Sequence, residues 1–128
     1  MSGLHHVEIW IADLASARRE WRWLLERLGF VQIAEWERGF SWEADGTYLT
    51  LTTSPNLAPG GHDRRRPGVN HLAFDGGSPA QVDAIMADAA AHGWAPLYAD
   101  RYPHAGGEGH YAGWLENADG FKVEVVAD

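Results

Sequence analysis

The chain has 128 residues, of which 45% are hydrophobic and 22% charged, and its formal net charge is −8. This composition is typical of a single folded domain. The acidic balance argues against nucleic acid or an anionic membrane as a partner, because both require a basic face. The absence of cysteine excludes disulfides, thiol catalysis and thiolate metal sites. That absence also fits a cytoplasmic protein, which we expect here, and no apolar run approaches the roughly 18 residues of a membrane span.

The first patterned stretch, residues 4–14, predicts a strand that leads to a helix cap at Asp13. Successive side chains of a strand point to opposite faces. One face is therefore apolar, and the other carries an imidazole, a carboxylate and an indole, from His6, Glu8 and Trp10. We expect the apolar face to pack on a helix and the polar face to line a pocket.

The rest of the first half predicts one helix and three strands. Apolar residues at helical spacing predict a helix that begins after Asp13 and stops at Gly29. Short strands are predicted at 30–36, 40–43 and 47–53, and the last two form a hairpin through Ala-Asp-Gly. Residues 55–68 predict an exposed linker, including a solvated arginine run at 64–66.

The second half predicts the same order of elements. A strand at 69–75 precedes a helix with a capping box from Ser78 to Gln81, and Gly93 ends that helix. Further strands are predicted at 94–99, 110–116 and 121–127. A glycine-rich loop covers 100–109, and an Asn-Ala-Asp-Gly turn suits a type I turn closed by a glycine bulge.

These matches indicate an internal repeat, because His6 and His71 stand at equivalent places, as do Gly29 and Gly93. We predict one α+β domain, residues 1–128, made of two βαβββ modules at 1–54 and 69–128. The modules are expected to form a curved eight-stranded cup with the helices outside.

Four symmetry-related positions are predicted to face this cup: His6, Thr50, His71 and Glu124. Two imidazoles and a carboxylate are the ligands of a mononuclear metal centre that leaves positions open for water or substrate. The sequence predicts one divalent ion held by His6, His71 and Glu124, with Fe, Mn, Ni and Zn all suitable.

The chain resembles the vicinal oxygen chelate superfamily, which includes glyoxalase I, extradiol dioxygenases, fosfomycin-resistance transferases and bleomycin-resistance proteins. The resemblance is carried by His-His-Val-Glu-Ile-Trp-Ile-Ala-Asp-Leu at 5–14, Val-Asn-His-Leu-Ala-Phe at 69–74 and Ala-Asp-Gly-Phe-Lys-Val-Glu-Val-Val at 118–126. It implies metal ligands on the first and last strand of each module, and a homodimer. Glyoxalase I has a carboxylate where this chain has Thr50.

Two functions follow as alternatives. The first is a metal-dependent lyase or extradiol-type dioxygenase acting on a small, apolar or aromatic, oxygen-bearing substrate. Its predicted catalytic residues are Glu8 and His110. The predicted substrate-binding residues are Trp10, Trp36, Tyr48, Thr50 and Trp114. The second is a metal-free protein that sequesters a drug or metabolite, of the bleomycin-resistance type.

Several of these residues have plainer interpretations. Glu8 could pair with an inward arginine, and His110 could be an ordinary surface histidine. His5 is expected to point away from His6 and to be structural, and Trp42 is expected to join the aromatic wall of the cup.

Overall fold

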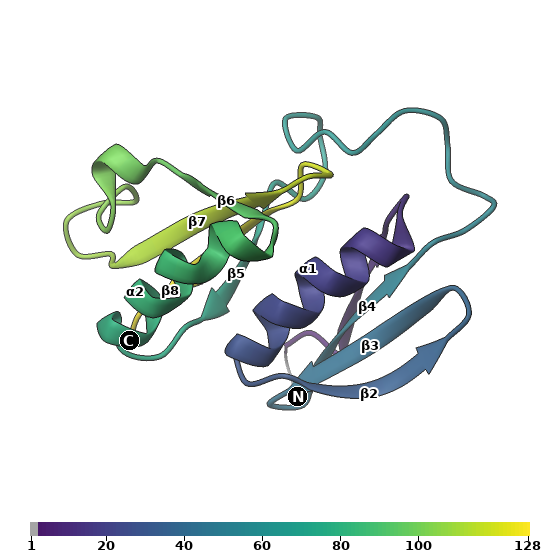
Figure 1. Cartoon of the computed structure of the whole chain (residues 1–128), viewed down its shortest axis with the longest axis horizontal. Helices are drawn as coiled ribbons and strands as arrows, with labels where there is room; N and C mark the ends of the chain where they lie inside the picture. The colour runs from purple at the N-terminus through teal and green to yellow at the C-terminus, as the bar shows by residue number, and fades with distance from the viewer. Residues whose placement is uncertain (1–2) are drawn as a thin grey trace. The chain divides into compact units, whose positions relative to one another are not determined.

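The computed structural model describes residues 3–128 and divides them into two compact units, one ending at Gly61 and the other running from His62 to Asp128. Each unit holds a four-stranded sheet and one α-helix among its described residues (Figure 1). The boundary falls inside the predicted linker at 55–68.

The first unit has the predicted order of one strand, one helix and three strands. Its sheet has the order β1-β4-β3-β2, in which β1 is parallel to β4 and the other pairs are antiparallel. The elements are β1 (His6–Trp10), α1 (Leu14–Arg27), β2 (Val31–Trp36), β3 (Gly39–Ala44) and β4 (Thr47–Thr52).

Helix α1 begins and ends where the sequence predicts. The Asp13 carboxylate accepts hydrogen bonds from the backbone N–H groups of Ala15 and Ser16, at 3.0 and 3.3 Å. Just past the helix, Gly29 has a φ of +84°, a left-handed conformation that costs glycine little. The helix lies over one face of the sheet, because the Arg18 guanidinium sits 5.7 Å from the centre of the Phe40 ring.

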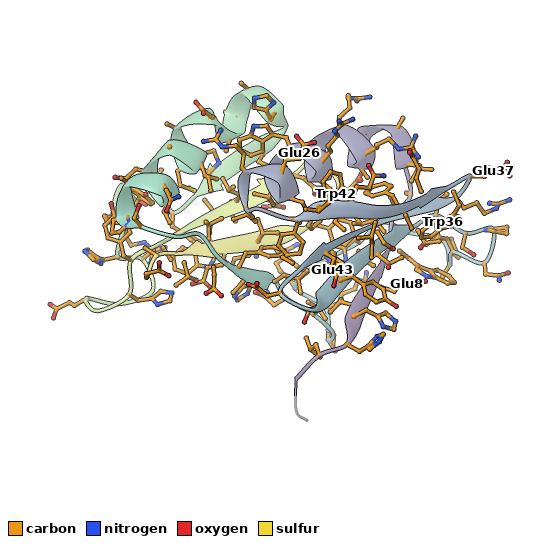
Figure 2. The ribbon with its side chains drawn as sticks, turned by 90° about the horizontal axis from the view of Figure 1, so that it is seen from below. Glu8, Glu26, Trp36, Glu37, Trp42 and Glu43 are labelled. Carbon is orange, nitrogen blue, oxygen red and sulfur yellow. The ribbon has the colours of Figure 1, made fainter. Side chains whose placement is uncertain are left out.

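That contact corrects the prediction for Trp42. In the β3–β4 ladder Phe40 is opposite Leu51 and Trp42 is opposite Leu49, so these residues share the face that α1 covers. Figure 2 shows Trp42 on the helix side of the first sheet, while Glu8 and Glu43 lie on its other side. Trp42 is therefore a core residue, only 4% exposed.

The second unit repeats this topology. Its sheet has the order β5-β8-β7-β6, in which β5 is parallel to β8 and the other pairs are antiparallel. The elements are β5 (Leu72–Asp75), α2 (Pro79–Asp88), η1 (Ala89–His92), β6 (Trp94–Leu97), η2 (Ala99–Arg101), β7 (Ala112–Asn117) and β8 (Lys122–Val126). The predicted repeat of two βαβββ modules is confirmed.

The cap and turn signals of the second unit are also confirmed, whereas its strands are shorter than predicted. Ser78 and Gln81 form the predicted capping box of α2. At the second hairpin, the N–H of Gly120 donates to the carbonyl of Asn117, and Gly120 has a φ of +85°, as a glycine bulge requires. The strand predicted from 69 begins only at Leu72, because the preceding residues leave the sheet.

Within residues 3–128, no helix is both long and apolar enough to cross a membrane.

Candidate functional site

Glu124 lies near the middle of the face of the second sheet that α2 does not cover. Val123 and Val125, its neighbours on β8, are fully buried. A Cβ on Gly76 would touch both Val125 and Val82 of α2, which places these valines on the helix side. Glu124 therefore points the other way, and it is paired with Trp114 of β7. It is only 6% exposed, so its carboxylate needs partners.

Two histidines supply those partners. The Nε2 atom of His71 lies 3.1 Å from Oε1 of Glu124, and Nε2 of His110 contacts the second oxygen, Oε2. The other ring nitrogen of His71, Nδ1, lies 2.8 Å from Oδ1 of Asn70. This arrangement fixes the imidazole plane of His71, as carbonyl and carboxylate oxygens do for metal-binding histidines.

The spacing of His71 and Glu124 fits two ligands of one ion. Ligand atoms lie roughly 2.0–2.2 Å from zinc, so neighbouring ligands of one ion are about 3 Å apart. Within the described part of the chain, no set of three or more His, Cys, Asp or Glu side chains is gathered as a metal-holding group. The assembled part of the predicted ligand set is thus the pair His71–Glu124, and the three-ligand set stays a prediction.

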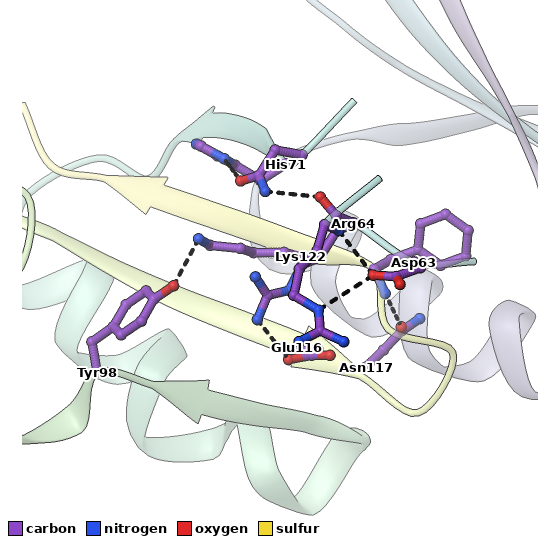
Figure 3. Close-up of polar contacts among 10 residues, drawn as sticks. Asp63, Arg64, His71, Tyr98, Glu116, Asn117 and Lys122 are labelled. Carbon is purple, nitrogen blue, oxygen red and sulfur yellow. Dashed lines mark hydrogen bonds and ion pairs between the residues drawn. The ribbon is translucent and has the colours of Figure 1, made fainter. Parts of the chain in front are cut away.

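A cationic group lies beside this pair on the same face, around the Tyr98 phenol (Figure 3). The Lys122 ammonium donates to the Tyr98 hydroxyl at 2.9 Å, and the Arg101 guanidinium lies 5.0 Å from the centre of the ring. The hydrogen bond from Lys122 lowers the pKa of Tyr98, and Arg64 and Arg101 act in the same direction. Sequence reasoning did not identify Tyr98.

Arg64 also departs from its predicted place in a solvated run. Its guanidinium lies 3.4 Å from the Glu116 carboxylate, and its side chain is only 22% exposed. Its neighbours Arg65 and Arg66 are 84% and 80% exposed, as predicted. The difference arises because this segment folds back on the β7–β8 hairpin, where the His62 ring stacks on Phe121 at 4.2 Å.

In the first unit, the face opposite α1 carries the other predicted residues. His6 stacks on Tyr48, its partner across the β1–β4 ladder, with ring centres 4.7 Å apart. The Nδ1 atoms of His5 and His6 are 2.8 Å apart, and His5 also packs edge-on against Tyr48. The prediction that His5 points away from His6 is therefore wrong. His5 lies before β1, so its side chain does not follow the alternation of faces along the strand.

Each of the remaining predicted residues of this face has a hydrogen-bond or packing partner within the first unit. The Trp10 indole N–H donates to the Glu8 carboxylate at 2.7 Å, which is the polar partner the structure gives Glu8 instead of an arginine. The Thr50 and Ser41 hydroxyls, both buried, are hydrogen-bonded at 2.7 Å. Trp36 lies over Gly39, where a Cβ would meet the indole at 2.8 Å.

Comparisons with known proteins agree with this topology. Residues 5–114 match the family model described as the glyoxalase/bleomycin resistance protein/dioxygenase superfamily. The chain is 44% identical to YqjT, an uncharacterised protein of Bacillus subtilis (strain 168), over 97% of this chain and 98% of that one.

Two solved structures are also similar. One is a Bacillus halodurans protein provisionally described as a glyoxalase, with 39% identity and a TM-score of 0.92 over 98% of this chain and 95% of that one. The other is a glyoxalase/bleomycin resistance protein from Albidiferax ferrireducens T118, with 25% identity and a TM-score of 0.76 over 98% of both chains.

Proposed function

Because the chain belongs to the glyoxalase/bleomycin resistance protein/dioxygenase superfamily, we propose that it is a divalent-metal-dependent enzyme acting on a small oxygen-bearing substrate. The superfamily includes metal-dependent lyases and dioxygenases. Within it, we propose a lyase or an extradiol-type dioxygenase. Thr50 supplies no carboxylate at the place where glyoxalase I has one, which disfavours the glyoxalase I reaction itself.

The observation that carries the proposal is the buried Glu124 carboxylate with the oriented His71 imidazole beside it. A buried carboxylate that serves only the fold needs hydrogen-bond donors, and backbone N–H groups or an arginine supply these well. Here both oxygens instead meet imidazole nitrogens, which are metal ligands. Asn70 fixes the outer nitrogen of one ring.

The roles of the chain's own residues follow from these contacts. His71 and Glu124 would hold the ion, with His6 as the predicted third ligand. When bound, a divalent ion supplies Lewis-acid polarisation of a substrate oxygen. His110, whose Nε2 atom contacts the Glu124 carboxylate, is proposed to carry a proton to or from the substrate. Glu8 is proposed as a second proton-transfer group, oriented by the Trp10 indole.

Metal analysis of untagged protein tests the proposal. After incubation with Fe(II), Mn(II), Ni(II) or Zn(II), about one ion per chain is expected, and Glu124→Ala or His71→Ala should abolish uptake. His62→Ala is the matched control, since the ring of this histidine stacks on Phe121 and does not meet Glu124. Protein that takes up none of the four ions would refute the metal-dependent function.

His6→Ala and His110→Ala separate the ligand from the proton carrier. If His6 is the third ligand, its loss should reduce metal content, while His110→Ala should retain the ion and lose turnover. The reverse result would assign His110 as a ligand and overturn its proton-transfer role. With the metal bound, oxygen uptake in the presence of a catechol distinguishes a dioxygenase from a lyase.

A metal-free binding protein is the second candidate, and the aromatic face of the first unit favours it. Trp10 and Trp36 are 43% and 41% exposed, and they lie on the same face as Tyr48. Quenching of tryptophan fluorescence by an aromatic ligand, equal with and without a chelator, would support sequestration. Quenching that requires the metal would contradict it.

We also propose that the protein is a homodimer, as the family resemblance implies. Light scattering on the eluted protein tests this directly, and a mass of one chain would refute it.

A further inference from the structure

We propose that Lys122 and Arg101, held beside Tyr98, form an anion-binding subsite next to Glu124, and that the substrate is a small planar organic acid whose carboxylate binds there. The inference rests on the proposed function for the position of the reacting end at His71 and Glu124. It adds the class of substrate and the residues that select it.

The first argument is charge. The chain has 18 acidic residues against 10 basic ones, and Lys122 is its single lysine. Yet three cationic side chains act on the Tyr98 phenol, namely Lys122, Arg64 and Arg101. Among residues 3–128, Lys122 and Arg101 have no carboxylate partner. Arg64 is paired with Glu116, so the uncompensated charges are those of Lys122 and Arg101, and an anionic ligand would offset their repulsion.

The second argument is the choice of partners within the group. Glu116 is directly opposite Lys122 across the β7–β8 ladder, where opposite charges stabilise each other. Nevertheless the Glu116 carboxylate pairs with Arg64, at 3.4 Å. Lys122 turns instead to a neutral hydroxyl, which occupies one of its three N–H donors and leaves two for a ligand. A simple surface ion-pair network would have paired the two opposite residues.

The third argument is the position of the group. Lys122 and Glu124 are two residues apart on β8, so they share a face and their backbones lie roughly 6.6 Å apart. Trp114 is paired with Glu124, and its indole makes a T-shaped contact with the Tyr98 ring, at 5.9 Å between centres. The indole also packs against the His110 ring, at 6.0 Å between centres, so one side chain adjoins both the histidine beside Glu124 and the tyrosine that holds Lys122. A flat molecule with oxygens at both ends fits this spacing.

The fourth argument is the backbone of Tyr98. Its φ of +56° is unusual for a residue with a large side chain, and such conformations persist only where the surroundings enforce them. The conformation turns the phenol toward Lys122 and places its ring under Arg101. Tyr98 is thus a positioning residue for the two cations.

The probe for the test is 4-hydroxybenzoate, which carries a carboxylate at one end of a flat ring and a hydroxyl at the other. Its partner is 4-hydroxybenzamide, in which the carboxylate is replaced by an uncharged amide. Affinities are measured by calorimetry on the full chain, with and without the bound metal ion. The first variant is Lys122→Met, which keeps most of the length of the side chain and removes its charge. The second is Arg101→Met, at an exposed position. Arg65→Met is the matched control, because Arg65 pairs only with Asp63 on the surface.

We expect wild-type protein to bind 4-hydroxybenzoate about 10- to 100-fold more tightly than the amide, the value of a charge-assisted hydrogen bond. Lys122→Met should remove that preference, Arg101→Met should reduce it, and Arg65→Met should keep it. Equal affinity for the two probes, or a preference that survives both Lys122→Met and Arg101→Met, would overturn the subsite. If Lys122→Met does not fold, the test uses Arg101→Met, which should reduce the preference, and the charge-retaining Lys122→Arg, which should keep it.

The outcome is independent of the metal-dependent function. Metal content is measured on the same samples, so a chain that binds metal but shows no carboxylate preference refutes only the subsite. A chain that binds no metal but loses its carboxylate preference in Lys122→Met refutes the metal proposal and supports the subsite.

Discussion

The hydrogen bond between the Ser41 and Thr50 hydroxyls allows a direct test of how much a buried polar pair on the first sheet contributes to the free energy of unfolding. The two residues are opposite each other on β3 and β4, and their oxygens are 2.7 Å apart. They are 5% and 6% exposed, so water is a poor substitute for either partner. The perturbation is Thr50→Val, which keeps the shape of the side chain and removes the hydroxyl.

The magnitude follows from what Thr50→Val leaves behind. Ser41 keeps a buried hydroxyl without its partner, and an unsatisfied buried group costs about 1–3 kcal/mol. Ser41→Ala strands the Thr50 hydroxyl in the same way. The double variant strands nothing, so its cost should fall below the sum of the single costs by about 1 kcal/mol or more.

Urea unfolding of the wild type, the two single variants and the double variant measures these free energies. Strictly additive costs, or single variants as stable as the wild type, would refute the reasoning. Metal content of Thr50→Val is the functional control. Because Ser41 already engages the Thr50 hydroxyl, this variant should bind the ion as well as the wild type does.

Three further predictions concern stability. Tyr102 and then Tyr111 donate hydrogen bonds to Asp83 and lower its pKa below 3.8, so this contribution is present above pH 3.8 and is lost as the pH falls through the lowered value. The melting temperatures of Asp83→Asn and wild type should therefore converge in acid, and a constant difference would contradict this. Gly39→Ala should cost about 1–3 kcal/mol, because its Cβ meets a backbone carbonyl, and chemical denaturation measures it. Gly113→Ala should cost less, since its Cβ meets a flexible methionine; equal costs would argue against the steric account.

Much of the fold could be predicted because period-two alternation is decisive where one face is buried. The buried Val123 and Val125 set the direction of Glu124, and the glycine bulge at the second turn then paired Glu124 with Trp114. The same reasoning, applied to β3, would have placed Trp42 correctly. Asp45 and Gly46 both have positive φ, so a two-residue turn puts Trp42 opposite Leu49 on the helix side.

The cationic part of the site could not be predicted, because it is built by segments without periodicity. Tyr98 lies just after β6, and its left-handed backbone sends the ring in a direction that no alternation describes. Arg64 comes from a stretch that reads as linker, and it reaches Glu116 through long-range packing on the hairpin. The one available signal was Lys122, a lysine two residues before Glu124 and therefore on the same face of the strand.

The backbone at Tyr98 also has a consequence for engineering this protein. An ordinary side chain in the left-handed region costs roughly 1–2 kcal/mol, whereas glycine pays little and asparagine less than most. A library of variants at position 98 that is sorted for thermal stability should therefore enrich glycine and asparagine. The same library sorted for carboxylate binding should retain tyrosine, so efforts to make the protein more heat-resistant would select against the proposed anion-binding subsite at this position.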